Sequence, residues 1–328
     1  MITRSKWFRR SLCALAVGLA ATAQAQQISM ETGTPSSVSG LVSQTMASRW
    51  GEDGVDVQLS MNQTMTKSVL KIGQGKLDAA MIPPNALGAL RAGTAPYLGL
   101  GDKGAAVADN IRALFSIPTS YYHAITWADS GIDSWADAAG KRVFIGPPGG
   151  AANAQITALA DAGGLPEGQY DAVKAPWGSA TQGFQDGQFD VLVMIYALGS
   201  QALSELSLSR DINLLSLTSE KAEPPEGLGL TRAAIPADTY PGQTNDADAV
   251  TWKTLMMMGV RRDLPDELAY QLTKSYVDRV GELAASNALL GELAGADPLA
   301  GLNARLHPGA ARYYREKGIR IPENLLPN

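Results

Sequence analysis

The chain has 328 residues, of which 45% are hydrophobic and 18% charged. These proportions are typical of a folded globular protein and exclude a disordered chain, and the length suffices for two domains. The formal net charge is −5, and an acidic chain argues against nucleic acid as a partner.

The first 25 residues have the pattern of a secretory signal peptide. Four basic residues and no acidic one accompany an apolar run that starts at Leu12, and Ala23-Gln24-Ala25 fits a small-x-small cleavage site. The apolar run is too short for a permanent membrane anchor, so we expect residues 1–25 to be cleaved on export. Arg9-Arg10 leaves a twin-arginine export route open.

Cleavage would change the net charge of the chain and remove its cysteine. It removes four of the 27 basic residues and none of the 32 acidic ones, which leaves 23 against 32 and a formal charge of −9. It also removes Cys13, the one cysteine, so the mature chain has neither a thiol nucleophile nor a disulfide. His123 and His307 are too few for a zinc site. We therefore expect no metal and no cofactor.

Strand-like and helix-like segments alternate from Gln27 onward, which predicts an α/β fold with largely parallel sheets. The expected strands are 28–31, 55–59, 77–82, 111–117, 121–127, 142–145, 171–174, 189–196 and 254–260. The expected helices are 41–50, 66–74, 134–139, one that follows Gly150, one that ends at Gln185, then 264–285 and 308–317.

Two such α/β series predict two lobes with a ligand cleft between them. We expect the chain to cross near 118–127 and again near 245–254, so that lobe 1 contains 26–118 and 250–328 and lobe 2 contains 119–249. Ligands of open α/β sheets bind at the carboxyl ends of the strands. Six strand-end loops should therefore face one another across the cleft.

A glycine-rich turn that begins at Gly146 connects one of these strands to a helix. The free N–H groups of a first helical turn and the positive end of the helix dipole favour a carboxylate or a phosphate. No Gly-Lys-Ser/Thr follows, so this is not a nucleotide loop. The alternative is that the glycines only permit a tight turn.

The candidate ligand contacts are hydroxyls, amides, aromatic rings and backbone groups in these loops. Apart from Lys174 at one edge, the six loops contain no lysine or arginine, which suits one negative group better than two. Ser36 or Ser37 has the alternative role of a helix N-cap. The candidates are Thr32, Gly33, Thr34, Ser36, Ser37, Asn62, Gln63, Thr64, Pro83, Asn85, Tyr122, Gly149, Gly150, Ala151, Asn153, Trp177, Gly178 and Tyr196.

Several sequence blocks resemble the TAXI family of solute receptors for TRAP transporters. They are GIDSWAD at 131–137, GKRV at 140–143, the stretch 146–165, IPADTYPGQ at 235–243 and RLHPGAARYYREKGI at 305–319. The resemblance implies a two-lobed periplasmic binding protein that closes on a small organic anion, often an amino acid or a dicarboxylate. It also implies delivery of that ligand to a TRAP membrane permease.

The sequence departs from the TAXI pattern where the ligand is held. The loop 32–40 has no tyrosine where the family has Tyr-Tyr-Pro, Asn62-Gln63-Thr64-Met65 replaces Thr-Gly-Gly-Ser, and Gly149-Gly150-Ala151 replaces Gly-Ser-Gly. We therefore expect a small monoanion or zwitterion, with a dicarboxylate such as 2-oxoglutarate as the alternative.

Two other functions remain open. A periplasmic sensor that partners a membrane signalling protein would have the same sequence features. A serine hydrolase built from Ser36, His123 and Asp78 is the second, although no Gly-x-Ser-x-Gly elbow occurs and His123 lies in an apolar run. We expect that the protein is not an enzyme.

Overall fold

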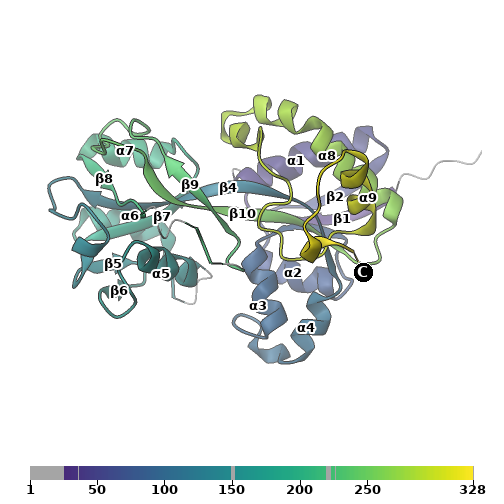
Figure 1. Ribbon diagram of the computed structural model, residues 1–328, viewed down its shortest axis with the longest axis horizontal. Helices are drawn as coiled ribbons and strands as arrows, with labels where there is room; N and C mark the ends of the chain where they lie inside the picture. Colours follow the sequence, from purple (N-terminus) through teal and green to yellow (C-terminus); the bar gives the residue numbers. More distant parts are fainter. Residues whose placement is uncertain (1–25, 36, 149–151, 219–222, 226, 328) are drawn as a thin grey trace, which may run out of the picture.

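Two long strands run through the molecule and join its two lobes (Figure 1). They are β4 (Ile111–Trp127) and β10 (Ala249–Arg261), which pair with each other in antiparallel orientation. The computed structural model describes residues 26–327 apart from 36, 149–151, 219–222 and 226. The expected signal peptide therefore lies outside the described residues.

One mixed sheet of ten strands passes through both lobes in the order β2-β1-β3-β10-β4-β7-β5-β6, with β8 beside β4 and β9 beside β10. The outer sets β2-β1-β3 and β7-β5-β6 are parallel, whereas β10 and β4 are antiparallel to their neighbours. The predicted α/β fold is confirmed. Each lobe has a parallel set of strands, but the two sets belong to one mixed sheet and not to a separate, mostly parallel sheet in each lobe. The remaining strands are β1 (Gln26–Glu31), β2 (Val55–Ser60), β3 (Ala79–Ile82), β5 (Arg142–Phe144), β6 (Asp171–Val173), β7 (Val191–Tyr196), β8 (Ile212–Leu214) and β9 (Leu230–Ile235).

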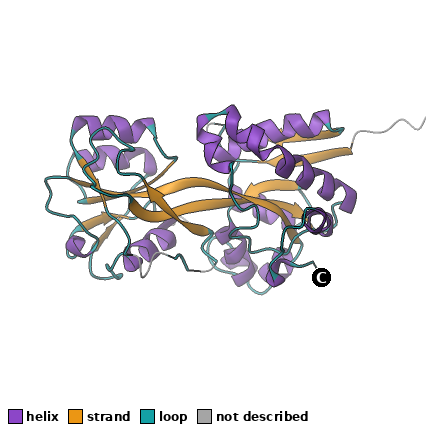
Figure 2. Ribbon diagram, turned by 45° about the horizontal axis from the view of Figure 1, so that its top comes forward, coloured by secondary structure: helices purple, strands orange, loops and turns teal. Residues whose placement is uncertain are grey.

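Helices cover the sheet in both lobes (Figure 2). Lobe 1, the part that holds β1 to β3, contains α1 (Val38–Glu52), α2 (Met65–Gly73), α3 (Pro84–Ala92), α4 (Lys103–Ala108), α8 (Asp266–Ser286) and α9 (Pro308–Glu316). Lobe 2, the part that holds β5 to β7, contains α5 (Ala152–Ala162), α6 (Trp177–Gln185) and α7 (Gln201–Ser209). Short 3-10 turns are η1 (Leu98–Leu100), η2 (Ala136–Ala138), η4 (Ala288–Leu293) and η5 (Glu323–Leu325). Among the helices described, none is long and apolar enough to cross a membrane.

Separate hydrophobic cores stabilise the two lobes. In lobe 1, Phe115 of β4 stacks on Tyr276 of α8 with ring centroids 3.7 Å apart. The buried residues of this core come from the chain up to Ile117 and from Met257 onward. The two core clusters of lobe 2 draw on residues between Tyr121 and Trp252. Because β4 and β10 supply residues to all three clusters, these strands tie the lobes together.

The sequence predictions differ from the structure in several elements. The predicted strands 111–117 and 121–127 are one strand, because Pro118 sits where the pairing with β10 is irregular and its missing N–H is tolerated. The predicted helix 134–139 is only the short η2, since the Asp137 carboxylate accepts from the Ser134 N–H and hydroxyl and closes a tight turn. The elements α3, α4, α7, β8 and β9 were not predicted.

Candidate functional site

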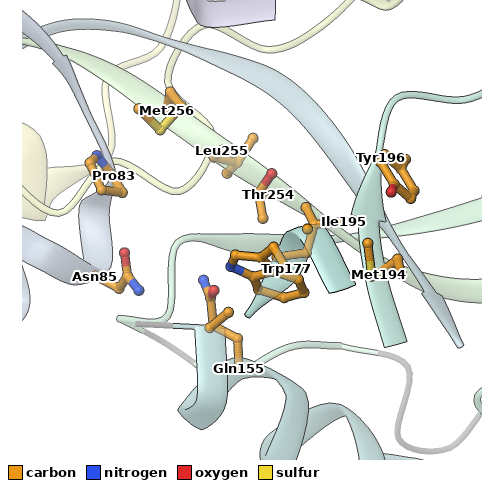
Figure 3. Close-up of a pocket in the computed structure, with 12 residues that line it drawn as sticks. Pro83, Asn85, Gln155, Trp177, Met194, Ile195, Tyr196, Thr254, Leu255 and Met256 are labelled. Atoms are coloured by element: carbon orange, nitrogen blue, oxygen red, sulfur yellow. The ribbon is translucent and has the colours of Figure 1, made fainter. Parts of the chain in front are cut away.

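A cavity of about 650 Å³ opens between the lobes and is lined by both of them (Figure 3). Its size is that of a pocket for a small organic ligand. Lobe 1 and the strand β10 contribute one wall, and α5, α6 and β7 of lobe 2 contribute the other. The lining residues are Pro83, Asn85, Ala152, Gln155, Trp177, Gly178, Met194, Ile195, Tyr196, Thr254, Leu255 and Met256.

The N-termini of three helices converge on this cavity. Asn85 lies in the first turn of α3, Ala152 begins α5, and Trp177 begins α6. Pro83 and Pro176 are the N-caps of α3 and α6, and neither supplies a side-chain hydrogen bond to its helix. First-turn N–H groups and three helix dipoles therefore give this part of the cleft a positive potential without a basic side chain.

The described lining of the cavity is otherwise neutral and largely apolar. It contains no Asp, Glu, Lys or Arg. Met194, Ile195, Leu255 and Met256 form an apolar wall, and Trp177 lies across the cavity between this wall and Gln155 (Figure 3). The arrangement fits a ligand with one negative group and an apolar body.

Gly146 leaves room for the Trp177 ring beside its backbone. Its φ of +95° belongs to a backbone conformation that side chains disfavour, and a Cβ atom there would lie 3.2 Å from the Trp177 ring. Trp177 packs edge-on against Phe144, with ring centroids 5.4 Å apart. The glycine-rich turn thus has a structural role at its first residue, because it allows the indole to close over the end of β5.

A second cavity of about 780 Å³ adjoins the first at Asn85, which lines both. It lies between α3 and the start of α5. Small side chains line most of it, among them Ala86, Ala89 and Ala92 of α3 and Ala154 of α5. The cleft therefore extends beyond the space beneath Trp177.

The structure brings part of the predicted site together. Pro83, Asn85, Trp177, Gly178 and Tyr196 line the first cavity, and Asn153 lines the second. Ser36, Gly149, Gly150 and Ala151 lie outside the described residues.

The first two predicted loops lie beside each other but outside the described lining of either cavity. Asn62 donates its backbone N–H to the carbonyl of Gly33, and Gln63 donates to that of Thr32. Ser37 is the N-cap of α1 and accepts from the Gly40 N–H, as its alternative role required. The remaining candidates of these loops are Thr34 and Thr64, of which Thr64 is the N-cap of α2. Their contact with a ligand stays a prediction.

Tyr122 lies behind the cavity wall and contacts a residue that lines it. It is fully buried, and its hydroxyl donates to the side-chain oxygen of Gln155 over 2.6 Å. Gln155 lines the cavity and was not predicted. Gln155 lies three residues after Ala152, about one helical turn, so both side chains are on the same face of α5. This spacing from the first residue of the helix could have identified Gln155 as a ligand contact.

The other residues that sequence reasoning missed lie on strands. Met194 and Ile195 belong to β7, and Thr254 to Met256 belong to β10. The apolar runs to which they belong predicted core strands, and the sequence carries no signal that β10 is open to the cleft where it crosses between the lobes.

The serine hydrolase arrangement is not assembled. His123 is fully buried, with Nδ1 3.0 Å from the Tyr121 carbonyl and Nε2 2.7 Å from the Tyr240 hydroxyl, and burial lowers its pKa to about 4. Asp78 instead accepts from Ser29 and Arg261. Both residues are therefore engaged with separate structural partners.

Within the part of the chain that the structure describes, no three His, Cys, Asp or Glu residues gather as a metal site.

The lobes, the crossing strands and the cleft together define the fold of periplasmic solute-binding proteins. The chain belongs to the NMT1-like family, which it matches over residues 30–318.

Solved structures of binding proteins have a similar fold. The periplasmic sulfonate-binding protein SsuA from Methylobacillus flagellatus KT aligns with a TM-score of 0.54 and 11% identity, over 90% of this chain and 88% of that chain. The aliphatic sulphonate binding protein SsuA from Escherichia coli aligns with a TM-score of 0.48 and 13% identity, over 90% of this chain and 84% of that chain. A TRAP periplasmic solute binding protein from Marinobacter aquaeolei VT8 aligns with a TM-score of 0.49 and 12% identity, over 88% of this chain and 91% of that chain. At these identities the likeness concerns the fold.

Proposed function

We propose that this protein is a periplasmic receptor that captures a small organic monoanion or zwitterion between its lobes and delivers it to a membrane permease. The observation that carries the proposal is the convergence of the N-termini of α3, α5 and α6 on one cavity whose described lining has no charged side chain. Backbone N–H groups and helix dipoles can hold one anionic group there, as at other helix N-termini.

The finer assignment also belongs to this proposal. A TRAP-type permease is the proposed partner, and the TAXI-like blocks at 131–143, 235–243 and 305–319 support it. The proposed division places 26–118 and 250–328 in lobe 1 and 119–249 in lobe 2. The core clusters support it except at Val250 and Trp252, which pack in a cluster of lobe 2. The proposed receptor binds its ligand without turning it over.

Ligand screening tests the proposal. Purified protein is heated with monocarboxylates, alkanesulfonates, amino acids and C4–C5 dicarboxylates, and binding is then measured by calorimetric titration. A ligand at a hundredfold excess over its Kd stabilises the folded state by about 2.7 kcal/mol, which raises the melting temperature measurably. We expect singly charged anions or zwitterions to bind. Binding of dicarboxylates alone would contradict the interpretation of this cavity as a site for one negative group.

A matched pair of variants locates the site. Asn85→Asp places a carboxylate of the same shape at the start of α3, and we expect at least tenfold weaker anion binding, about 1.4 kcal/mol. Gln169→Glu is the control, because it adds the same charge at an exposed position just before β6, at the end of that strand remote from α6. Equal effects of the two variants would mean that overall charge, and not this cavity, governs binding.

Delivery needs its own measurement. Membrane vesicles that carry a TRAP-type permease, the proposed partner, should take up the ligand only when the receptor is added. Uptake at the same rate without the receptor would leave ligand capture as a separate, sensory role.

A further inference from the structure

Gln155 holds a tightly constrained polar group in the cavity. The residue is only 6% exposed, and its amide rises from α5 toward the space between Asn85 and Trp177 (Figure 3). Its Oε1 accepts from the Tyr122 hydroxyl at 2.6 Å, and its Nε2 donates to the Leu228 carbonyl at 2.7 Å. One amide is therefore held from two sides, by β4 and by the segment that precedes β9.

These two partners fix which way the amide points. A carbonyl oxygen can only accept, so the nitrogen of Gln155 must face Leu228. The oxygen then faces Tyr122, whose hydroxyl must donate, and burial raises the pKa of that hydroxyl so that it keeps its proton. An amide NH₂ group has two N–H bonds, and Leu228 takes one. No partner among the described residues takes the second, so it can be donated to a molecule in the cavity.

The other polar side chains around this space are neutral, and those of Asn85 and Tyr196 can donate to an anion. The indole nitrogen of Trp177 faces the space between Asn85 and Gln155 (Figure 3). The Thr254 hydroxyl is bonded to Thr119 and Ser120. In the described lining no carboxylate is present to pair with an ammonium group, and a buried ammonium without a partner is strongly disfavoured.

We infer that Gln155, oriented by Tyr122 and the Leu228 carbonyl, is a ligand-binding donor that makes this site select monoanions without an ammonium group over amino acids. The inference rests on the proposed function and narrows its ligand class to carboxylates or sulfonates with an apolar body. Tyr122 is a positioning residue, since it acts through Gln155. The apolar wall of Met194, Ile195 and Leu255 receives the body of the ligand.

Matched ligand pairs test the selectivity. Calorimetry compares hexanoate with norleucine, and 3-phenylpropanoate with phenylalanine, so that each pair differs by one ammonium group. We expect the plain carboxylate to bind at least tenfold more tightly in at least one pair. If the carboxylate and the amino acid bind equally, the inference is wrong while the proposed function stands. If neither class nor any other small anion binds, the proposed function itself fails.

Variants test the residues. Gln155→Met removes the donor without adding charge, and we expect the ratio of carboxylate to amino-acid affinity to fall at least fivefold. Gln155→Glu replaces the donor by a carboxylate of the same shape and should weaken carboxylate binding by tenfold or more. An unchanged ratio in a folded Gln155→Met protein would overturn the inference.

A pair of tyrosine variants separates positioning from stability. Tyr122→Phe removes the hydroxyl that orients Gln155, and we expect a threefold to tenfold fall in the same ratio. Tyr314→Phe is the control, because its buried hydroxyl donates to the Leu114 carbonyl in the core of lobe 1. Both variants should lower the melting temperature, but only Tyr122→Phe should change the ratio. Equal ratios in the two variants would reduce Tyr122 to a structural residue.

Discussion

The hydroxyls of Thr119 on β4 and Thr254 on β10 lie 2.7 Å apart at the place where the pairing of the two strands between the lobes becomes irregular. Thr254 also bonds to both backbone groups of Ser120. Side-chain hydroxyls thus replace regular ladder hydrogen bonds at this point. Such an interruption allows the strands to bend there without loss of the flanking pairs.

Ligand binding should therefore bring the lobes closer together about this crossing. Contacts from both walls of the cavity favour the closed arrangement, because only that arrangement satisfies both sides of the ligand. Small-angle scattering should give a smaller radius of gyration at saturation with the tightest-binding anion of the panel. An identical scattering profile with and without the anion would indicate a fixed pocket.

Thr119→Val should lower the stability of the protein by weakening the contact between β4 and β10, and it should leave the ligand contacts intact. Thr119 does not line the first cavity, and its hydroxyl bonds to Thr254. We expect the free energy of unfolding to fall by about 1 kcal/mol, the typical net contribution of such a hydrogen bond. Urea unfolding measures this change. Thr119→Ser, which keeps the hydroxyl, is the control and should lose less.

Trp177 should contribute more to affinity than any other aromatic residue at the site. We expect Trp177→Ala to weaken binding of an apolar monocarboxylate by about 2 kcal/mol, roughly thirtyfold, because a large buried aromatic surface is lost. Trp177→Phe should retain part of that affinity. Calorimetric titration with hexanoate checks both. Unchanged affinity in Trp177→Ala would place the ligand elsewhere in the cleft, such as the second cavity beside Ala89 and Ala154.

Gly146→Ala should disturb both stability and binding. The φ of +95° alone strains an alanine by about 1–3 kcal/mol, and the added Cβ would also press on the Trp177 ring. Gly164→Ala is a matched control, since Gly164 has a φ of +96° and, its chain neighbours aside, nothing lies within 4 Å of the place that the methyl group would take. Chemical denaturation should show a loss in both variants, whereas calorimetry should show weaker binding only for Gly146→Ala. Equal binding in the two would mean that the ring position does not matter.

The sequence predicts the periodic parts of this fold well. The apolar runs near 28–31, 55–59 and 189–196 correspond to β1, β2 and β7, and Leu268, Leu272 and Leu283 lie buried on one face of α8, as their spacing requires. These elements are fixed by burial pattern, which a sequence contains. The turn at 134–139 depends on a specific Asp137 hydrogen bond, which periodicity does not encode.

The site is predictable only where a loop follows a strand and starts a helix. Pro83, Asn85 and Trp177 have such positions, so the rule that ligands bind at carboxyl strand ends selects them. The hydroxyls of the first loop fit the same rule, but the side chain of Ser37 caps α1. Leu255 could not be found this way, because an apolar residue on a central strand is indistinguishable from a core residue until the crossing between the lobes is known.

His123 should make the stability of the folded protein depend on pH between about 6.5 and 4. Burial lowers its pKa from 6.5 to about 4, so the folded protein keeps the ring neutral while the unfolded chain takes up a proton below pH 6.5. Stability is therefore complete above pH 6.5 and falls as the pH approaches 4, by about 3 kcal/mol for this residue. His307, whose pKa burial also lowers, contributes in the same direction. Carboxylates with lowered pKa, such as Asp78, add their loss as the pH approaches their ordinary pKa of 3.8 and falls below it.

The variant His123→Asn isolates this contribution. An asparagine can still donate to the Tyr121 carbonyl, but it does not titrate. Urea unfolding from pH 8 to pH 4 should show a smaller fall for the variant than for the wild-type protein, by about 3 kcal/mol, although the variant starts lower because the Tyr240 hydroxyl loses its partner. The remaining fall in the variant comes from His307 and, near pH 4, from carboxylates such as Asp78. Parallel pH profiles of the two proteins would mean that the pKa of His123 is the same in the folded and unfolded states, which would contradict the effect of burial.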